Sequence, residues 1–100
     1  MLGKFDAIVN ANVPVLIDFH AEWCQPCKIQ APMLKDFAAQ MGDKIKVIKI
    51  DVDKNPEIAQ RFQIQGVPTI ALFKDGNLVW RQSGVVPVQQ LMQVVNPHLS

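Results

Sequence analysis

Two compact apolar runs stand out along the chain, and each is interrupted by charged side chains. They span residues 15–19 and 45–52, are rich in Val and Ile, and contain Asp18 and Lys49 respectively. Apolar runs of this length are typical of strands that are buried on both faces of a sheet. The pattern therefore predicts two buried strands, each with a charge where an apolar residue is expected.

Two further strands are predicted in the C-terminal half, at residues 69–73 and 78–81. Asp75 and Gly76 lie between them. An Asp-Gly pair readily adopts the positive φ angles that a tight hairpin turn requires. These two strands are therefore expected to pair in antiparallel fashion.

Apolar residues at helical spacing separate the strands. The expected helices are a short one over 5–13 that Pro14 ends, one that follows the cysteine-containing loop and is closed by Gly42, one that Asn55 caps, and one that is stopped by the Asn-Pro pair at 96–97. The order of elements is thus α-β-α-β-α-β-β-α. It predicts an α/β fold with a mixed sheet and helices on both faces. One hundred residues fit a single domain, 1–100.

Cys24 and Cys27 are the only cysteines and lie three positions apart. A disulfide across so short a loop stabilises little, because the stabilisation grows with loop size. The pair stands at the predicted start of a helix, where partial positive charge and unpaired N–H groups favour a thiolate. We therefore expect Cys24 to attack a substrate disulfide and Cys27, one turn deeper, to resolve the mixed disulfide.

The alternative for the cysteines is half of a zinc site, which needs two more ligands. His20 and His98 lie far apart in the sequence without finger-like spacing. We favour the redox interpretation and expect no metal.

Asp18 lies on the same strand face as His20 by alternation, and is expected beneath the cysteine loop. Burial should raise its pKa and make it a proton acceptor for Cys27, with Lys49 of the neighbouring strand as its partner. The alternative is a structural ion pair, which contributes little to stability by itself. His20 either tunes the thiolate or packs at the strand end, and we favour packing.

The net charge is +1 and no Lys/Arg run occurs. We therefore expect neither a nucleic-acid partner nor binding to a membrane. No apolar stretch reaches the roughly 18 residues of a membrane span. Residues 1–4 lack the apolar block of a signal peptide, so we expect a cytoplasmic protein, although an upstream segment would change that.

An ordered set of motifs extends along the chain: the run 15–28 (VLIDFHAEWCQPCK), Ala31 and Pro32, Lys49 and Asp53, Asn55 and Pro56, the run 66–69 (GVPT), the run 73–76 (FKDG), and Gly84. Through these residues the sequence resembles the thioredoxin family from about Phe5 to the C-terminus. A lone pair of cysteines would be weak evidence, but this ordered set is highly specific.

The resemblance implies a role for each matched site residue. It makes Cys24 the nucleophile, Cys27 the resolving thiol, Asp18 the buried acid–base group with Lys49 nearby, and Pro68 a cis-proline that faces the disulfide. It places the substrate-binding surface at Trp23, Gln25, Pro26, Gly66, Val67 and Gly84. It also implies thioredoxin reductase and disulfide-containing client proteins as partners, and no bound cofactor beyond the cysteine pair.

The chain departs from the family pattern in three places. Gln25 replaces the usual Gly between the cysteines, and His20 replaces a frequent Trp. Only three residues precede the first helix, so we expect the family's first strand to be missing and the sheet to have four strands. Residues 45–52 would then form an edge, through which a dimer or domain swap is an alternative to the expected monomer.

We conclude from the sequence that the chain is a protein-disulfide reductase of the thioredoxin type. Two alternatives remain open. One is a redox-independent binding or chaperone-like module on the same fold, and the other is an oxidase or isomerase.

Overall fold

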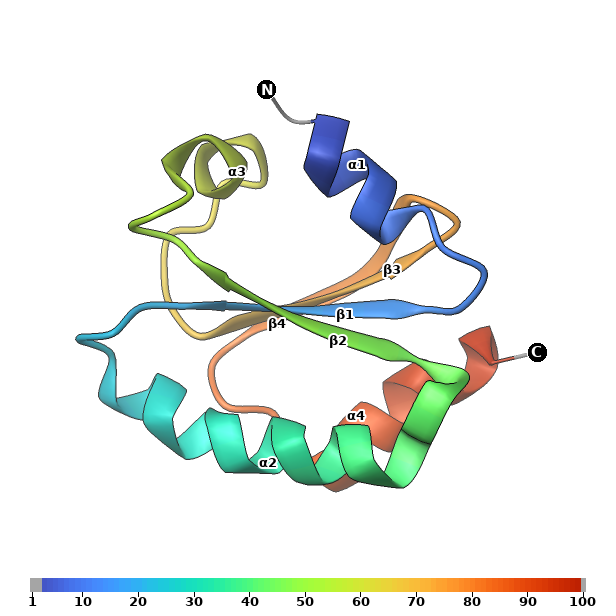
Figure 1. Cartoon of the computed structure of the whole chain (residues 1–100). Coiled ribbons are helices and arrows are strands. Elements are labelled where there is room, and N and C mark those ends of the chain that lie inside the picture. The colour runs from blue at the N-terminus through green and yellow to red at the C-terminus, as the bar shows by residue number, and fades with distance from the viewer. Residues whose placement is uncertain (1–2, 100) are drawn as a thin grey trace.

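The computed structural model describes residues 3–99, which form four helices and four strands with two short 3-10 turns (Figure 1). The elements are α1 (Gly3–Val9), β1 (Val15–His20), α2 (Gln25–Met41), a 3-10 turn (Gly42–Lys44), β2 (Lys46–Asp51), α3 (Pro56–Arg61), β3 (Thr69–Lys74), β4 (Asn77–Ser83), α4 (Val88–Val95) and a second 3-10 turn (Asn96–His98). The predicted order of helices and strands is confirmed.

The sheet has the strand order β2-β1-β3-β4. β2 runs parallel to β1, while β3 is antiparallel to both β1 and β4. The predicted mixed sheet of four strands is therefore confirmed, with β2 at one edge. Lys4 lies in α1 rather than in a strand, while Met1 and Leu2, which the prediction of a missing first strand also covered, lie outside the described residues.

The helices cover the sheet in two layers, with α1 and α3 on one face and α2 and α4 on the other (Figure 1). Each face has its own apolar core. Leu16 and Leu72 pack among residues of α2 and α4, whereas Phe19 and Phe73 pack among residues of α1 and α3. Alternating side chains of the central strands thus reach opposite layers. Within residues 3–99, no helix has both the length and the apolar character needed to cross a bilayer.

The first helix is shorter than predicted. It was expected to continue to the residue before Pro14, but α1 ends at Val9. The carbonyl of Val9 accepts a hydrogen bond from the N–H of Gly76, 3.1 Å away in the β3–β4 hairpin. This hydrogen bond occupies the Val9 carbonyl oxygen, which would accept a backbone N–H of the next turn if the helix continued.

Asn55 precedes α3 as predicted, but its side chain does not cap the helix. Instead, its Nδ2 donates to the carbonyl oxygen of Asp51 at 3.0 Å. The side chain is therefore used to close the turn after β2.

The predicted hairpin is confirmed, with Asp75 and Gly76 both at positive φ. Within it, the register shifts so that Leu72 faces Trp80 while Phe73 faces Leu78. Val79 is the extra residue of this bulge. Because a bulge reorients the side chains around it, residues 78–81 do not follow the simple alternation of a regular strand.

Candidate functional site

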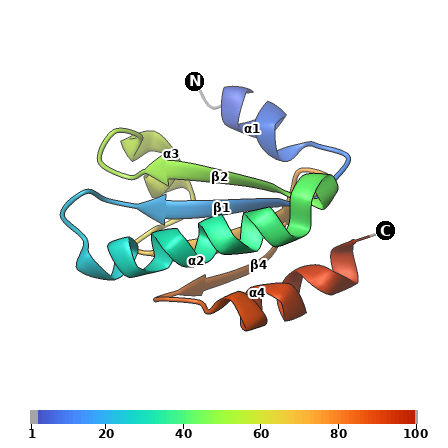
Figure 2. The same ribbon diagram turned by 60° about the horizontal axis from the view of Figure 1, so that its bottom comes forward.

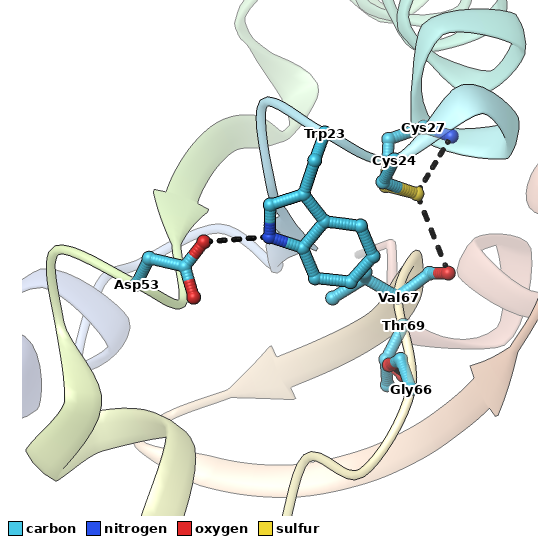
Figure 3. The surroundings of a disulfide bond; sticks show 7 residues. All are labelled: Trp23, Cys24, Cys27, Asp53, Gly66, Val67 and Thr69. Carbon is cyan, nitrogen blue, oxygen red and sulfur yellow. Dashed lines mark hydrogen bonds between the residues drawn. A yellow bond between two sulfur atoms is a disulfide. The ribbon is translucent and has the colours of Figure 1, made fainter.

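Cys24 and Cys27 form a disulfide at the N-terminus of α2, with their Cα atoms 5.3 Å apart. Cys24 is the N-cap residue, and its Sγ accepts a hydrogen bond from the backbone N–H of Cys27 at 3.1 Å (Figure 3). An N–H donor and the positive end of a helix both stabilise negative charge on sulfur. The local structure therefore favours a thiolate at Cys24 when the disulfide is reduced.

The loop that carries Pro68 lies directly against this disulfide. Sγ of Cys24 is 3.4 Å from the carbonyl oxygen of Val67, and the Val67–Pro68 peptide bond is cis, as the resemblance implied (Figure 3). A disulfide sulfur carries no hydrogen, so this contact becomes a hydrogen bond only when Cys24 is a protonated thiol. The contact between the Val67 carbonyl oxygen and Sγ of Cys24 therefore changes with the redox and protonation state of Cys24.

Thr69, which is fully buried, holds this loop in place. Its Oγ1 donates to the carbonyl oxygen of Gly66 at 2.7 Å and lies 3.2 Å from Oγ of Ser83. On the other side, the N–H of Gly84 donates to the carbonyl oxygen of Pro68 at 2.8 Å. These bonds connect the loop to β4 and bring Gly84 beside Pro68.

Trp23 is the most exposed large apolar residue of the site, with 70% of its surface accessible. Its Nε1 donates to Oδ2 of Asp53 at 2.8 Å, which fixes the indole ring in an exposed position (Figure 3). A hollow of about 190 Å³ lies beside the ring and is also lined by Gly66 and Val67. Three of the residues predicted to bind substrate therefore border one hollow.

Two more of the predicted substrate-binding residues begin α2. Gln25 and Pro26 are its first two residues, and both are exposed between the two cysteines. Pro26 has no N–H, so it leaves none unpaired at this helix position.

Asp18 lies under the active-site segment, as the strand alternation predicted. Only 1% of its surface is exposed, and its Oδ1 has no hydrogen-bond partner. It lines a cavity of about 340 Å³ that is also lined by Cys27. Burial raises the pKa of Asp18 above its usual value, while the nearby charges of His20 and Lys49 act in the opposite direction.

Lys49 is opposite Asp18 in the β1–β2 register and lines the same cavity. In the part of the chain that the structure describes, no ion pair within 4.0 Å joins the two side chains. Lys49 is exposed, so its ammonium group remains largely hydrated. Its effect on Asp18 is therefore a through-space attraction rather than a direct bond. His20 lines this cavity too, beside Asp18 and Cys27.

Two supporting residues were not given a role by sequence reasoning. Asp53 was noted only as part of the resemblance, and Gln30 was not singled out. Gln30 is fully buried in α2 and exchanges two hydrogen bonds with the backbone of Val86. The available signal was an amide side chain on the apolar stripe of a helix, where it needs buried partners.

Among residues 3–99, no group of three or more His, Cys, Asp or Glu side chains could hold a metal ion. The reactive groups that the structure shows at the site are the joined sulfur atoms of Cys24 and Cys27.

The comparisons with known proteins agree with this geometry. The thioredoxin family model, described as Thioredoxin, matches residues 2–97. The chain is 46% identical over 90 residues to thioredoxin 1 of Chlorobaculum tepidum, covering 90% of this chain and 89% of that protein. It is also 46% identical over 96 residues to thioredoxin of Bacillus subtilis, covering 96% of this chain and 91% of that protein.

The similarity extends to three-dimensional structure. A solved structure of a mutant thioredoxin from Halobacterium salinarum matches with a TM-score of 0.88 and 34% sequence identity, covering 98% of this chain and 85% of that chain. With the cysteine pair joined at the start of α2 and a family match over almost the whole sequence, the chain belongs to the thioredoxin family and is a protein thiol–disulfide oxidoreductase.

Proposed function

We propose that the chain reduces disulfides in client proteins, with Cys24 as the nucleophile and Cys27 as the resolving thiol. The observation that carries this assignment is the position of Cys24 at the N-cap of α2, where its sulfur accepts the N–H of Cys27. Cys27 is one turn deeper and lacks that donor, so the two sulfurs differ in their readiness to ionise.

In the proposed reaction, the Cys24 thiolate attacks one sulfur of the client disulfide. A mixed disulfide forms between Cys24 and the client, and the other client sulfur leaves as a thiolate. The thiolate of Cys27 then attacks Sγ of Cys24, which closes the Cys24–Cys27 disulfide and releases the second client thiolate. Two electrons pass from the cysteine pair to the client, and the protons of the two cysteines end on the client thiols or in solvent.

Asp18 is the proposed acceptor of the Cys27 proton. Both side chains line the same cavity, whose volume of about 340 Å³ leaves room for a water molecule between them. The carboxylate must be ionised to accept the proton, and the positive charge of Lys49 favours that form. Lys49 therefore supports the transfer without contacting Cys27.

The client is proposed to dock on the apolar surface around the disulfide. Trp23, Gly66 and Val67 border the hollow of about 190 Å³, which has room for a small apolar side chain of the client. Pro68 and Gly84, which are joined by a backbone hydrogen bond, continue this surface beyond Val67, while Gln25 and Pro26 border it at the start of α2. An extended client segment would bring its disulfide to Cys24 from this side.

We further propose that the oxidised pair is reduced by a thioredoxin reductase, whose own nicotinamide cofactor supplies the two electrons. The cytoplasm is the proposed compartment, since it keeps such dithiols reduced. The chain is proposed to act as a single domain and a monomer, with no bound cofactor besides its disulfide. The comparisons lend no support to a redox-independent binding module.

An insulin disulfide-reduction assay tests the proposal. The wild-type chain should reduce insulin when thioredoxin reductase and NADPH are supplied. Cys27→Ser should accumulate a mixed disulfide with insulin because the resolving thiol is missing, whereas Cys24→Ser should form none. Trapping by Cys24→Ser instead would reverse the two roles, and full activity of the double variant would disprove the redox function.

A further inference from the structure

The outer edge of β2 carries backbone N–H and C=O groups that do not pair with another strand of the sheet. The N–H groups of Lys46 and Val52 donate to carbonyls of the β1 segment. Alternate residues of a parallel strand bond to the same neighbour, so Val47 and Lys49 turn their N–H and C=O groups away from β1. No backbone group within residues 3–99 pairs with them. Figure 1 looks onto this edge, with β2 in front of β1.

The opposite edge of the sheet, β4, is less suited to adding a strand. The bulge at Val79 interrupts its register with β3. Bulges of this kind protect edge strands because they twist the backbone away from regular pairing. The six residues of β2 pair with β1 in an unbroken register. β2 is therefore the edge that offers a regular ladder to a further strand.

A groove of about 390 Å³ beside this edge is lined by residues of α2 and β2. Figure 2 shows that α2, rather than α4, is the helix on the side of the sheet where β1 and β2 lie. Its apolar lining is formed by Ala31, Pro32, Leu34, Ala38 and Val47. The side chains of an added strand that point toward α2 would enter this groove. The groove shares Ala31 and Lys49 with the cavity that Cys27 lines. One end of the groove therefore adjoins the redox site.

The charges around the groove are positive. Lys35 of α2 and Lys49 of β2 are the two charged residues that line it, and no carboxylate does. Lys46 adds a third exposed lysine at the start of β2, on the sheet face opposite to that of Val47 and Lys49. An incoming segment with carboxylates near its apolar residues would complement this charge pattern.

The same charges disfavour a second copy of the chain. A two-fold antiparallel pairing that used the whole free edge would place Val47 opposite Asp51, and Lys49 directly opposite Lys49 of the other copy. Like charges facing each other across two strands are destabilising. The lysines thus act against self-pairing while leaving the edge available to an acidic segment.

We propose that the β2 edge and the α2–β2 groove form a docking surface for an extended segment of a partner protein that carries aliphatic and carboxylate side chains. The backbone of the segment pairs with Val47 and Lys49, and its aliphatic side chains fill the groove. Its carboxylates meet Lys35, Lys46 and Lys49. This surface is distinct from the one around Trp23, and the inference does not depend on the proposed redox roles.

The test uses the oxidised wild-type chain and a cysteine-free peptide, Glu-Glu-Val-Thr-Val-Thr-Val-Glu-Glu, so that no disulfide exchange takes part. With the peptide at saturation, amide hydrogen exchange at Val47 and Lys49 should slow by roughly tenfold or more. Exchange at Ile48 and Ile50 should change little, because their N–H groups already bond to β1. A peptide with Lys in place of each Glu is the matched control and should bind much more weakly.

Variants with reversed charges provide a second test of the docking surface. Lys35→Glu combined with Lys46→Glu should weaken binding of the acidic peptide roughly tenfold. Lys4→Glu combined with Lys74→Glu makes the same change in net charge elsewhere and should leave binding unchanged. Equal binding of both peptides would overturn the proposal, as would a dimer of the free chain in sedimentation. It would also be overturned if the peptide slowed hydrogen exchange mainly at Trp23 and Val67, or did not slow it at β2.

Discussion

Gln30 of α2 and Val86 of the segment before α4 are joined by two reciprocal hydrogen bonds. Gln30 Nε2 donates to the Val86 carbonyl oxygen at 3.0 Å, and the Val86 N–H donates to Gln30 Oε1 at 2.7 Å. Both residues are fully buried. The amide therefore links α2 to the backbone of the β4–α4 connection, 56 residues further along the chain.

Replacing Gln30 should destabilise the fold. Gln30→Leu fits the apolar surroundings but leaves the buried N–H and C=O of Val86 without partners, so the free energy of unfolding should fall by about 2 kcal/mol or more. Urea unfolding measures this. Gln40→Leu, an exposed change in the same helix, is the control and should stay within about 0.5 kcal/mol of wild type. Equal stability of the two variants would show that the Gln30 link is energetically neutral.

Asp18 should make stability depend on pH. Burial raises the pKa of Asp18 in the folded chain above its unfolded value, so the folded state holds the proton more tightly in the interval between the two values. The free energy of unfolding should therefore fall as pH rises through that interval, and the ionised carboxylate should remain a cost at higher pH.

Asp18→Asn removes this titration. The variant should match wild type in acid and exceed its unfolding free energy at neutral pH by roughly 1–3 kcal/mol. Urea unfolding over a pH series gives the comparison, and the exposed Asp36→Asn serves as its control. The same variant should close the disulfide more slowly after attack on insulin. A stability gain that is independent of pH would contradict the assigned ionisation.

His20 should shift the pH profile of the second chemical step. Asp18 shares its cavity with the ionisable side chains of His20, Glu22, Lys28 and Lys49. The positive charge of His20 lowers the pKa of Asp18. His20→Phe should therefore raise the pKa of Asp18 and slow the resolving step at mildly acidic pH by roughly two- to fivefold.

The measurement for His20 is the rate of release of a reduced client from a preformed mixed disulfide, recorded against pH. His98→Phe, near the C-terminus, is the matched control. An unchanged profile in His20→Phe would assign His20 to packing alone.

Gly66 should separate client docking from the chemistry of the sulfurs. A Cβ atom at this position would meet nothing within 4 Å, so Gly66→Leu should fold normally while its side chain projects into the hollow beside Trp23. Reduction of insulin should fall roughly tenfold or more, because closely fitted contacts at a docking surface contribute about 1–2 kcal/mol each. Reduction of a small aromatic disulfide should change far less. A parallel loss with both substrates would instead indicate damage to the cysteine site.

Much of the fold followed from local patterns. The apolar runs identified β1 and β2, and Asp75 with Gly76 identified the hairpin, because both signals depend only on neighbouring residues. The position of Cys24 at a helix start was readable for the same reason. The end of α1 was not, because the hydrogen bond that ends the helix comes from Gly76 in a distant hairpin.

The sequence by itself determined the redox chemistry, since two cysteines three positions apart at the start of a helix are placed by the helix itself. Strand alternation also predicted that Asp18 lies beneath them. Only the tertiary structure decided how its carboxylate is surrounded: Lys49 faces Asp18 without forming an ion pair, and Oδ1 of Asp18 has no hydrogen-bond partner. Such relationships depend on the path of the whole chain and on competition for each buried polar group, and no local pattern encodes that competition.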